Sequence, residues 1–126
     1  MPTIERFEDI KAWQKSRKLV KTIYRLTAKT KFNRDFGLRE QIRRAAISIM
    51  SNIAEGFERE SQKDCVVFLN YARGSCGELR TQIHIGMEIG YIKRQKGEQW
   101  KKEAQYISSM LSSLIKTKKR FIEENK

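Results

Sequence analysis

Basic side chains recur along one face of a predicted helix near the start of the chain, and such residues can bind phosphates. At about 100° per residue they fall within about 80° of arc, opposite Trp13, Val20 and Thr27. With a rise of ~1.5 Å per residue the stripe extends ~27 Å, enough to neutralise several backbone phosphates without reading bases. The alternative is a solvated face that keeps the chain soluble. The stripe consists of Lys11, Lys15, Lys18, Arg25 and Lys29.

A second basic set lies near the other end of the chain. The chain has 27 basic and 15 acidic residues, a formal net charge of +12, and the excess is concentrated in residues 1–34 and 93–126. This charge favours polyanionic partners, with nucleic acid first and an anionic membrane surface second. Because we predict neither an Arg-rich recognition helix nor an exposed aromatic platform, backbone binding is favoured over base-specific readout. The second set consists of Lys101, Lys102, Lys116, Lys119 and Arg120.

Short polar side chains form another stripe on the second and third predicted helices. On the second helix this stripe adjoins the apolar one, whereas a solvated face would normally carry Lys, Glu and Gln. We therefore predict a polar seam between these two helices, buried inside one subunit or between subunits. Its residues are Gln41, Arg44, Ser48, Asn52 and Glu55 from the second helix and Tyr71, Ser75, Glu78 and Gln82 from the third.

Charged residues in and beside this seam allow two interpretations. Arg43, Arg44, Glu55 and Glu78 could form an acid–base or phosphate site, or a structural ion-pair network. We favour the structural ion-pair network. Removing one partner of a buried ion pair costs ~3–5 kcal/mol, so an arrangement that leaves a charge unpaired is unfavourable. Such a seam can therefore specify one assembly. His84, the only histidine, is predicted to lie on an ordinary surface or interface. No zinc-ligand set, nucleophile elbow or phosphate loop is present, so we expect no enzymatic activity, metal or cofactor.

Four helical segments must position these residues. Helical periodicity is interrupted at residues 33–37, 56–61 and 90–97, and the only proline is Pro2. The predicted helices span about residues 8–31, 36–58, 61–89 and 97–123, and Ser61 is expected to cap the third. Short connections make neighbouring helices antiparallel. The sequence therefore predicts a single all-α domain over residues 1–126, an antiparallel up-and-down four-helix bundle.

The predicted inward faces are apolar, with one unusual run of small residues. Each glycine inside the third helix costs up to ~1 kcal/mol relative to alanine. Between Ala72 and Gly77 the only large residue is Arg73, so we expect a neighbouring helix to approach closely there. The inward residues include Ile10, Trp13, Val20, Ile23, Tyr24 and Thr27 in the first helix, Cys65, Phe68, Ala72, Cys76, Leu79, Ile83 and Gly86 in the third, and Trp100, Ala104, Ile107, Leu111, Leu114, Ile115 and Phe121 in the fourth.

The two cysteines and the N-terminal sequence bear on location. Cys65 and Cys76 are eleven residues apart in one predicted helix, ~16 Å along its axis, which excludes a disulfide between them within a monomer. The N-terminal sequence contains acidic residues and lacks the apolar stretch of a signal peptide, and the longest apolar run, residues 65–69, is too short to span a bilayer. We expect a cytoplasmic protein with reduced thiols and no membrane partner.

Residues 41–56 read Gln-Ile-Arg-Arg-Ala-Ala-Ile-Ser-Ile-Met-Ser-Asn-Ile-Ala-Glu-Gly. This segment resembles the signature of the four-helix-bundle family encoded by intervening sequences within bacterial 23S ribosomal RNA genes. The resemblance covers most of residues 7–92, although Asn33-Arg34-Asp35 replaces the family's usual Pro-x-Glu before the second helix. Further matching positions are Phe7, Trp13, Leu19, Tyr24, Phe36, Gly37, Leu38, Phe68, Leu69, Ala72, Gly74, Ser75, Glu78, Leu79, Thr81, Gln82, Gly90, Tyr91 and Ile92.

The resemblance implies a homopentamer and a relation to accessory variability determinant proteins of diversity-generating retroelements, which bind nucleic acid and a reverse transcriptase. Two hypotheses follow. The first is a non-catalytic basic oligomer that binds the backbone of RNA or DNA. The alternative is a protein-interaction scaffold, or an accessory subunit of a nucleoprotein complex such as a reverse transcriptase complex. Periodicity alone does not give the number of subunits or choose between RNA and DNA.

Overall fold

The computed structural model describes residues 4–126, and every regular element in this part of the chain is helical. The all-α prediction is therefore confirmed. In chain order the elements are the 3-10 helix η1 (Phe7–Asp9) and the α-helices α1 (Lys11–Thr27), α2 (Thr30–Arg34), α3 (Phe36–Glu58), α4 (Gln62–Glu88) and α5 (Arg94–Glu124). No helix among these residues is both long and apolar enough to cross a membrane.

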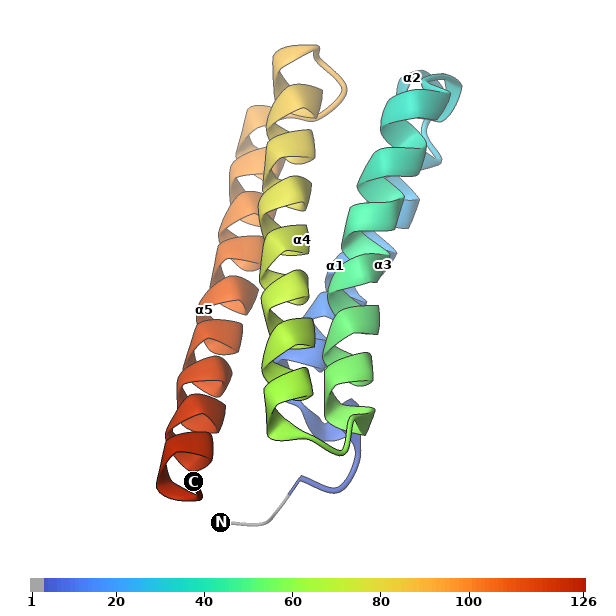
Figure 1. Cartoon of the computed structure of the whole chain (residues 1–126). Helices are drawn as coiled ribbons and strands as arrows, with labels where there is room; N and C mark the ends of the chain where they lie inside the picture. Colours follow the sequence, from blue (N-terminus) through green and yellow to red (C-terminus); the bar gives the residue numbers. More distant parts are fainter. Residues whose placement is uncertain (1–3) are drawn as a thin grey trace.

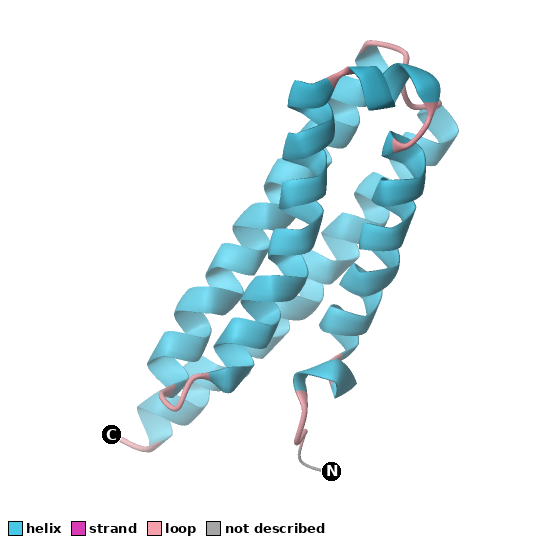
Figure 2. Ribbon diagram, turned by 90° about the vertical axis from the view of Figure 1, so that its right-hand side faces the viewer, coloured by secondary structure: helices cyan, strands magenta, loops and turns pink. Residues whose placement is uncertain are grey.

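Four long helices lie side by side, and successive ones run in opposite directions (Figure 1). Helix α1 packs against α3 and α5, and α4 packs against the same two helices, so α1 and α4 lie on a diagonal. The short α2 lies at one end, beside the start of α3 (Figure 1). A view turned by 90° shows the same elongated arrangement (Figure 2). The outer surface therefore consists mainly of long helix faces and the grooves between them.

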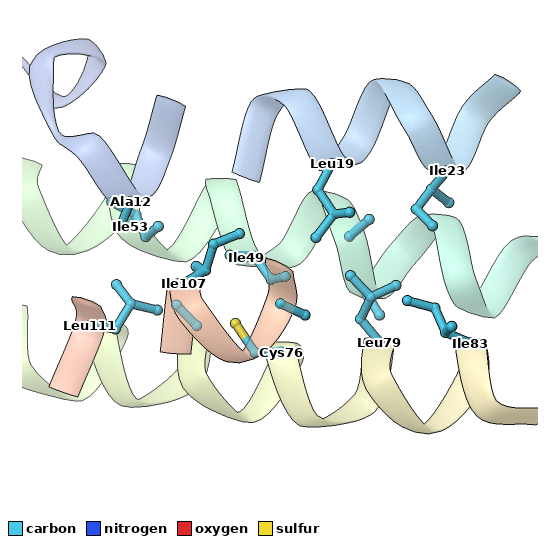
Figure 3. Close-up of a cluster of buried hydrophobic side chains, with 14 of the residues drawn as sticks. Ala12, Leu19, Ile23, Ile49, Ile53, Cys76, Leu79, Ile83, Ile107 and Leu111 are labelled. Carbon is cyan, nitrogen blue, oxygen red and sulfur yellow. The ribbon is translucent and has the colours of Figure 1, made fainter. Parts of the chain in front are cut away.

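The core is a stack of aliphatic side chains from all four long helices (Figure 3). Each such side chain contributes ~1.5–3 kcal/mol when fully removed from water. Because the buried stripe of each helix fixes its rotation about its axis, the core also decides which side chains face solvent. Among the stacked residues are Leu19 and Ile23 of α1, Ile49 and Ile53 of α3, Leu79 and Ile83 of α4, and Ile107 and Leu111 of α5.

The predicted continuous helix over residues 8–31 is wrong, because the structure divides that region into η1, α1 and the start of α2. The backbone is extended at Ile10 (φ −75°, ψ 123°) and at Lys29 (φ −77°, ψ 154°). The second break redirects the chain so that Phe32 is buried, with its ring centroid 5.2 Å from that of Tyr91. The free energy gained by burying this ring at the end of the bundle exceeds the free energy lost by interrupting the helix.

Two aromatic residues predicted to face inward lie on the surface. Tyr24 is 39% exposed and Phe121 is 50% exposed. The buried stripe of α1 is instead centred on Leu19 and Ile23, which turns Tyr24 to the edge of the helix, where the Arg43 guanidinium lies 4.4 Å from its ring centroid. Phe121 belongs to the last turn of α5, which begins at Arg94 and is three residues longer at its start than predicted.

Capping interactions explain where α3 and α4 begin. The Leu38 backbone amide donates to Asp35 Oδ1 (3.1 Å), and the Tyr91 hydroxyl donates to Asp35 Oδ2 (3.2 Å). Asp35 therefore supplies the helix start although the family's usual Pro-x-Glu is replaced. The predicted cap of α4 is confirmed, since the Asp64 amide donates to Ser61 Oγ (3.1 Å). Helix α4 ends before Gly90, whose φ of +84° suits glycine.

Candidate nucleic-acid interface

Three lysines of the basic stripe, Lys11, Lys15 and Lys18, lie along the groove between α1 and α5, here named the α1–α5 groove. Lys15, Lys18 and Thr22 of α1 line one part of it, together with Glu103 and Tyr106 of α5. This part has a volume of about 110 Å³, less than the ~300–1,000 Å³ of typical small-molecule pockets. This narrow part can therefore hold only a segment of a ligand that extends along the groove.

Lys11 continues the same groove toward the other end of α1. It lines the adjoining hollow with Met110, Ser113 and Thr117 of α5. The three lysines Lys11, Lys15 and Lys18 thus share one rim of the groove. Hydroxyl-bearing and neutral side chains occupy most of the opposite rim.

The other two residues of the predicted stripe, Arg25 and Lys29, do not line the α1–α5 groove. Arg25 is exposed near the end of α1, but Lys29 lies after the helix has ended, in the turn before α2. Lys11 to Arg25 spans ~21 Å along one helix at ~1.5 Å per residue. The continuous helical stripe is therefore shorter than predicted, and the position of Lys29 is set by the turn.

The basic residues of the α1 stripe form no ion pairs among the described residues. Across residues 4–126, none of the five stripe residues lies within 4.0 Å of a carboxylate in an ion pair. Glu103, which lines the same groove, forms no such pair either. Unpaired like charges along a groove raise the local positive potential and attract anions.

Tyr106 is a candidate ligand-contacting residue that the sequence analysis did not identify. Its side chain is 52% exposed, and its ring centroid lies 5.4 Å from Lys15 Nζ. The expectation of no exposed aromatic platform is therefore wrong at this position. Tyr106 directly precedes the buried Ile107 and falls outside the inward stripe of its helix, and this offset is the sequence signal for exposure.

The predicted basic residues of α5 do not line the α1–α5 groove. Lys101 faces α4, where its Nζ lies 3.2 Å from His84 Nδ1 and 4.0 Å from Glu98 Oε1. His84 itself is exposed, as expected for an ordinary surface residue, and lies 2.6 Å from Glu88. The remaining predicted residues are exposed and lie in none of the hollows that make up the α1–α5 groove: Lys102, Lys116, Lys119 and Arg120.

Part of the polar seam lies inside a single chain, between α3 and α4. The Ser75 hydroxyl donates to Ser48 Oγ (2.8 Å), and Asn52 Nδ2 donates to both the Ser48 carbonyl and Ser48 Oγ (2.9 Å each). About two turns further along α4, Gln82 Oε1 is buried without a hydrogen-bond partner among the described residues. The short side chains in the stripe are thus explained by helix packing within the subunit.

The outer part of the seam faces solvent. Gln41, Arg44, Tyr71 and Glu78 are all exposed in the single chain. They are therefore available to another molecule.

The predicted ion-pair network among the seam arginines and glutamates does not form within the described part of a single chain. Glu55 Oε1 pairs with Arg59 Nη2 (2.6 Å), whereas Arg43 Nε donates to Thr27 Oγ1 (2.7 Å). Arg44 and Glu78 form no ion pair within the described part of the chain. Adjacent residues of a helix point ~100° apart, so Arg43 faces α1 while its neighbour faces solvent.

Helix α4 carries a second, exposed stripe, here named the α4 outer stripe. Its members recur at alternating intervals of four and three residues, the spacing that brings helices together in coiled coils. Apart from the local helix backbone, no atom of the described residues lies within 4 Å of the place that a Gly74 Cβ would occupy, so α3 approaches the small-residue run at Ser75 but not at Gly74. The stripe consists of Val67, Tyr71, Gly74, Glu78, Thr81 and Ile85.

Both cysteines are free and buried. Burial raises the pKa of the Cys76 thiol to about 12, with Arg80 and Arg73 opposing the shift. Burial also raises the pKa of Cys65, and Lys118 opposes that change. Both groups therefore remain protonated near neutral pH, which disfavours a nucleophilic role. No group of three or more potential metal-ligating side chains occurs among the described residues.

These features define a small all-helical protein with unpaired positive charge along one interhelical groove. The chain belongs to the 23S rRNA-intervening sequence protein family, whose model matches residues 8–113. It is also similar to a crystal structure of a protein with unknown function from the S23 ribosomal protein family of Bacteroides thetaiotaomicron. That match has a TM-score of 0.76 and 26% identity, and it covers 83% of this chain and 98% of the other. Comparison with curated proteins gave no match.

Proposed function

We propose that this protein is a non-catalytic, basic homo-oligomer that binds the backbone of RNA or DNA through the α1–α5 groove. The observation that carries this proposal is the row of Lys11, Lys15 and Lys18 along an open groove without ion pairs. Lysine ammonium groups bind phosphate oxygens and release condensed counterions, which favours association. The family name refers to an intervening sequence of 23S rRNA, which supports RNA as the first ligand to test.

Assembly through the α4 outer stripe would multiply this surface. Val67, Tyr71 and Ile85 are exposed apolar groups at coiled-coil spacing, and the open position at Gly74 allows close approach of a second copy. We propose that the antiparallel up-and-down bundle assembles as a homopentamer, with the number five taken from the family resemblance. Five chains of net charge +12 would carry about +60, a strong field for a polyanion.

The direct test is fluorescence anisotropy with a structured RNA and a mixed-sequence DNA duplex over a series of salt concentrations. We expect the logarithm of the affinity to fall linearly with the logarithm of salt concentration. Reversing Lys11, Lys15 and Lys18 to glutamate should abolish binding while light scattering gives an unchanged particle mass. The ratio of the RNA and DNA affinities would identify the preferred nucleic acid.

The matched control reverses three exposed basic residues of α5 outside this groove, Lys102, Lys116 and Arg120. It changes net charge by the same amount and should leave most of the binding intact. Equal losses in the two variants would show that net charge, not the groove, determines binding. Absence of wild-type binding at low salt would contradict the proposal.

The alternative function is a protein scaffold or an accessory subunit of a nucleoprotein complex, such as one containing a reverse transcriptase. The exposed apolar residues of the α4 outer stripe favour it, because a different protein could cover them. In that case light scattering would give a monomer and wild-type protein would not bind free nucleic acid. In either case we place the protein in the cytoplasm, where its two thiols stay reduced.

A further inference from the structure

We infer that the α1–α5 groove takes an unpaired nucleic-acid strand, with one base stacked on Tyr106. This inference rests on the proposed function and specifies its substrate class. The exposed ring of Tyr106 lies in the same hollow as Lys15 and Lys18. The groove therefore combines the two components by which proteins hold single strands, a cationic track and an aromatic stacking surface.

The aromatic ring distinguishes this groove from a purely electrostatic surface. In a duplex each base is stacked between its neighbours, whereas unpaired bases can be splayed out onto a side chain. Tyr106 projects from the long helix α5 and is anchored beside the buried Ile107, so it is presented by a rigid element. The nearby Lys15 ammonium, 5.4 Å from the ring centroid, can move to a phosphate when a base covers the ring.

The groove also has two chemically different rims. The α1 rim presents Lys11, Lys15 and Lys18, spaced by ~6 and ~4.5 Å along the helix axis at ~1.5 Å per residue. Glu103 lies across the groove beside Tyr106 and would repel a phosphate. Phosphates therefore belong on the α1 rim and bases on the α5 rim.

Glu103 further suggests which bases fit. A carboxylate accepts hydrogen bonds but donates none, and amino groups of cytosine or adenine can donate to it. A strand whose bases carry exocyclic amino groups should therefore bind better than oligouridine. Glu103→Gln should reduce this difference, because the amide can donate as well as accept.

The experiment compares a labelled single strand of about 16 nucleotides with the duplex of the same sequence, at one low salt concentration. Wild-type protein should prefer the single strand. Tyr106→Ser should weaken single-strand binding by about 5- to 150-fold, the range expected for loss of one stacked base, and leave duplex binding nearly unchanged. Tyr106→Trp should retain the preference for the single strand.

Phe36 provides a matched control. It is also an exposed aromatic residue beside a cation, 65% exposed with the Arg39 guanidinium 4.6 Å from its ring centroid, but it is not in the α1–α5 groove. Phe36→Ser should leave both affinities unchanged. Circular dichroism and light scattering verify that each variant keeps its fold and assembly.

A second measurement uses wild-type protein and needs no variant. Irradiation with a 4-thiouridine-containing strand should give a cross-link in the peptide that contains Tyr106. If Tyr106→Ser binds single strands normally and the cross-link lies elsewhere, the stacking inference fails while loss of binding on reversal of the three lysines still supports the proposed function. If wild-type protein binds neither form, the proposed function itself fails.

Discussion

Cys76 lies among the stacked aliphatic side chains of the core, and its burial raises the pKa of its thiol to about 12 from an ordinary 9.0. The folded state therefore keeps the proton that the unfolded state loses more readily. The stabilisation from the neutral thiol is complete below about pH 9 and is lost as the pH rises toward about 12, by up to ~1.4 kcal/mol per pH unit.

The corresponding prediction compares wild-type protein with Cys76→Ala by urea denaturation between about pH 8 and 10.5. The substitution removes both the packing and the titrating thiol. The free energy of unfolding of wild-type protein should therefore fall more steeply, and the difference between the two proteins should shrink by ~1–2 kcal/mol over this range. A constant difference would show that the thiol ionises equally in the folded and unfolded states. Cys65→Ala serves as the comparison at the more open end of the bundle.

Residue types were predicted more accurately than residue partners. The apolar stripe identified Ile23, Leu79 and Ile107 as core, because helical spacing directly determines which residues share a face. The sequence could not show that Arg43 would contact Thr27, since that contact depends on how α1 and α3 rotate against each other. Similarly, the packing of α5 against α1 places Tyr106 in a groove with α1, so a residue that the sequence showed only to lie outside the core became a candidate contact.

Two glycines of α4 give a test at the level of the helix. Replacing either glycine with alanine raises the helix propensity at that position, which can stabilise the helix by up to ~1 kcal/mol. At Gly77 no described atom other than the local helix backbone lies within 4 Å of the added Cβ, whereas at Gly86 the Cβ would lie 2.7 Å from Ile92 Cδ1. Gly77→Ala should therefore stabilise the protein by up to ~1 kcal/mol, and Gly86→Ala should destabilise it by ~1–3 kcal/mol through overpacking.

Chemical denaturation of the two variants would check these opposite signs. Stabilisation by Gly86→Ala would mean that Ile92 adopts another rotamer without cost and that the contact at the end of α4 is adaptable. Destabilisation by Gly77→Ala would indicate that another molecule covers that position in the assembled protein. Ala72, which is already buried in the same helix, shows that α4 accommodates alanine in its core face.

The elements themselves differ in how far the sequence determined them. The bounds of α3, Phe36–Glu58, coincide with the prediction because local signals lie at both ends, with Asp35 capping its start and Ser61 capping the next helix three residues after its end. The first predicted helix does not continue to residue 31 because its end depends on Phe32. This residue packs near Tyr91 and Gly86, both more than 50 residues away in the sequence. Local periodicity contains no information about such distant contacts.

At the level of the whole molecule, the role of the α4 outer stripe in oligomer formation can be tested. If the α4 outer stripe joins copies of the chain, Tyr71→Glu combined with Ile85→Glu places unpaired charges in the interface, at a cost of several kcal/mol. Light scattering should then show monomers, while circular dichroism shows unchanged helix content because both side chains are exposed in the single chain. Phe36→Glu, an equally drastic change at an exposed position outside the stripe, should leave the assembly intact.

The monomeric variant also separates the contribution of one groove from that of several grooves acting together. A short strand occupies one groove, so its affinity should be nearly the same for the monomer and the wild-type oligomer. A long strand can engage grooves on several subunits, and a second contact made within the same complex benefits from a high effective concentration, with gains of ~10²–10⁴-fold when the geometry permits. We therefore expect the Tyr71→Glu, Ile85→Glu variant to lose affinity for long strands selectively. Equal affinities of oligomer and monomer for long strands would mean that the grooves face directions that one strand cannot join, and assembly would then serve a purpose other than tighter binding.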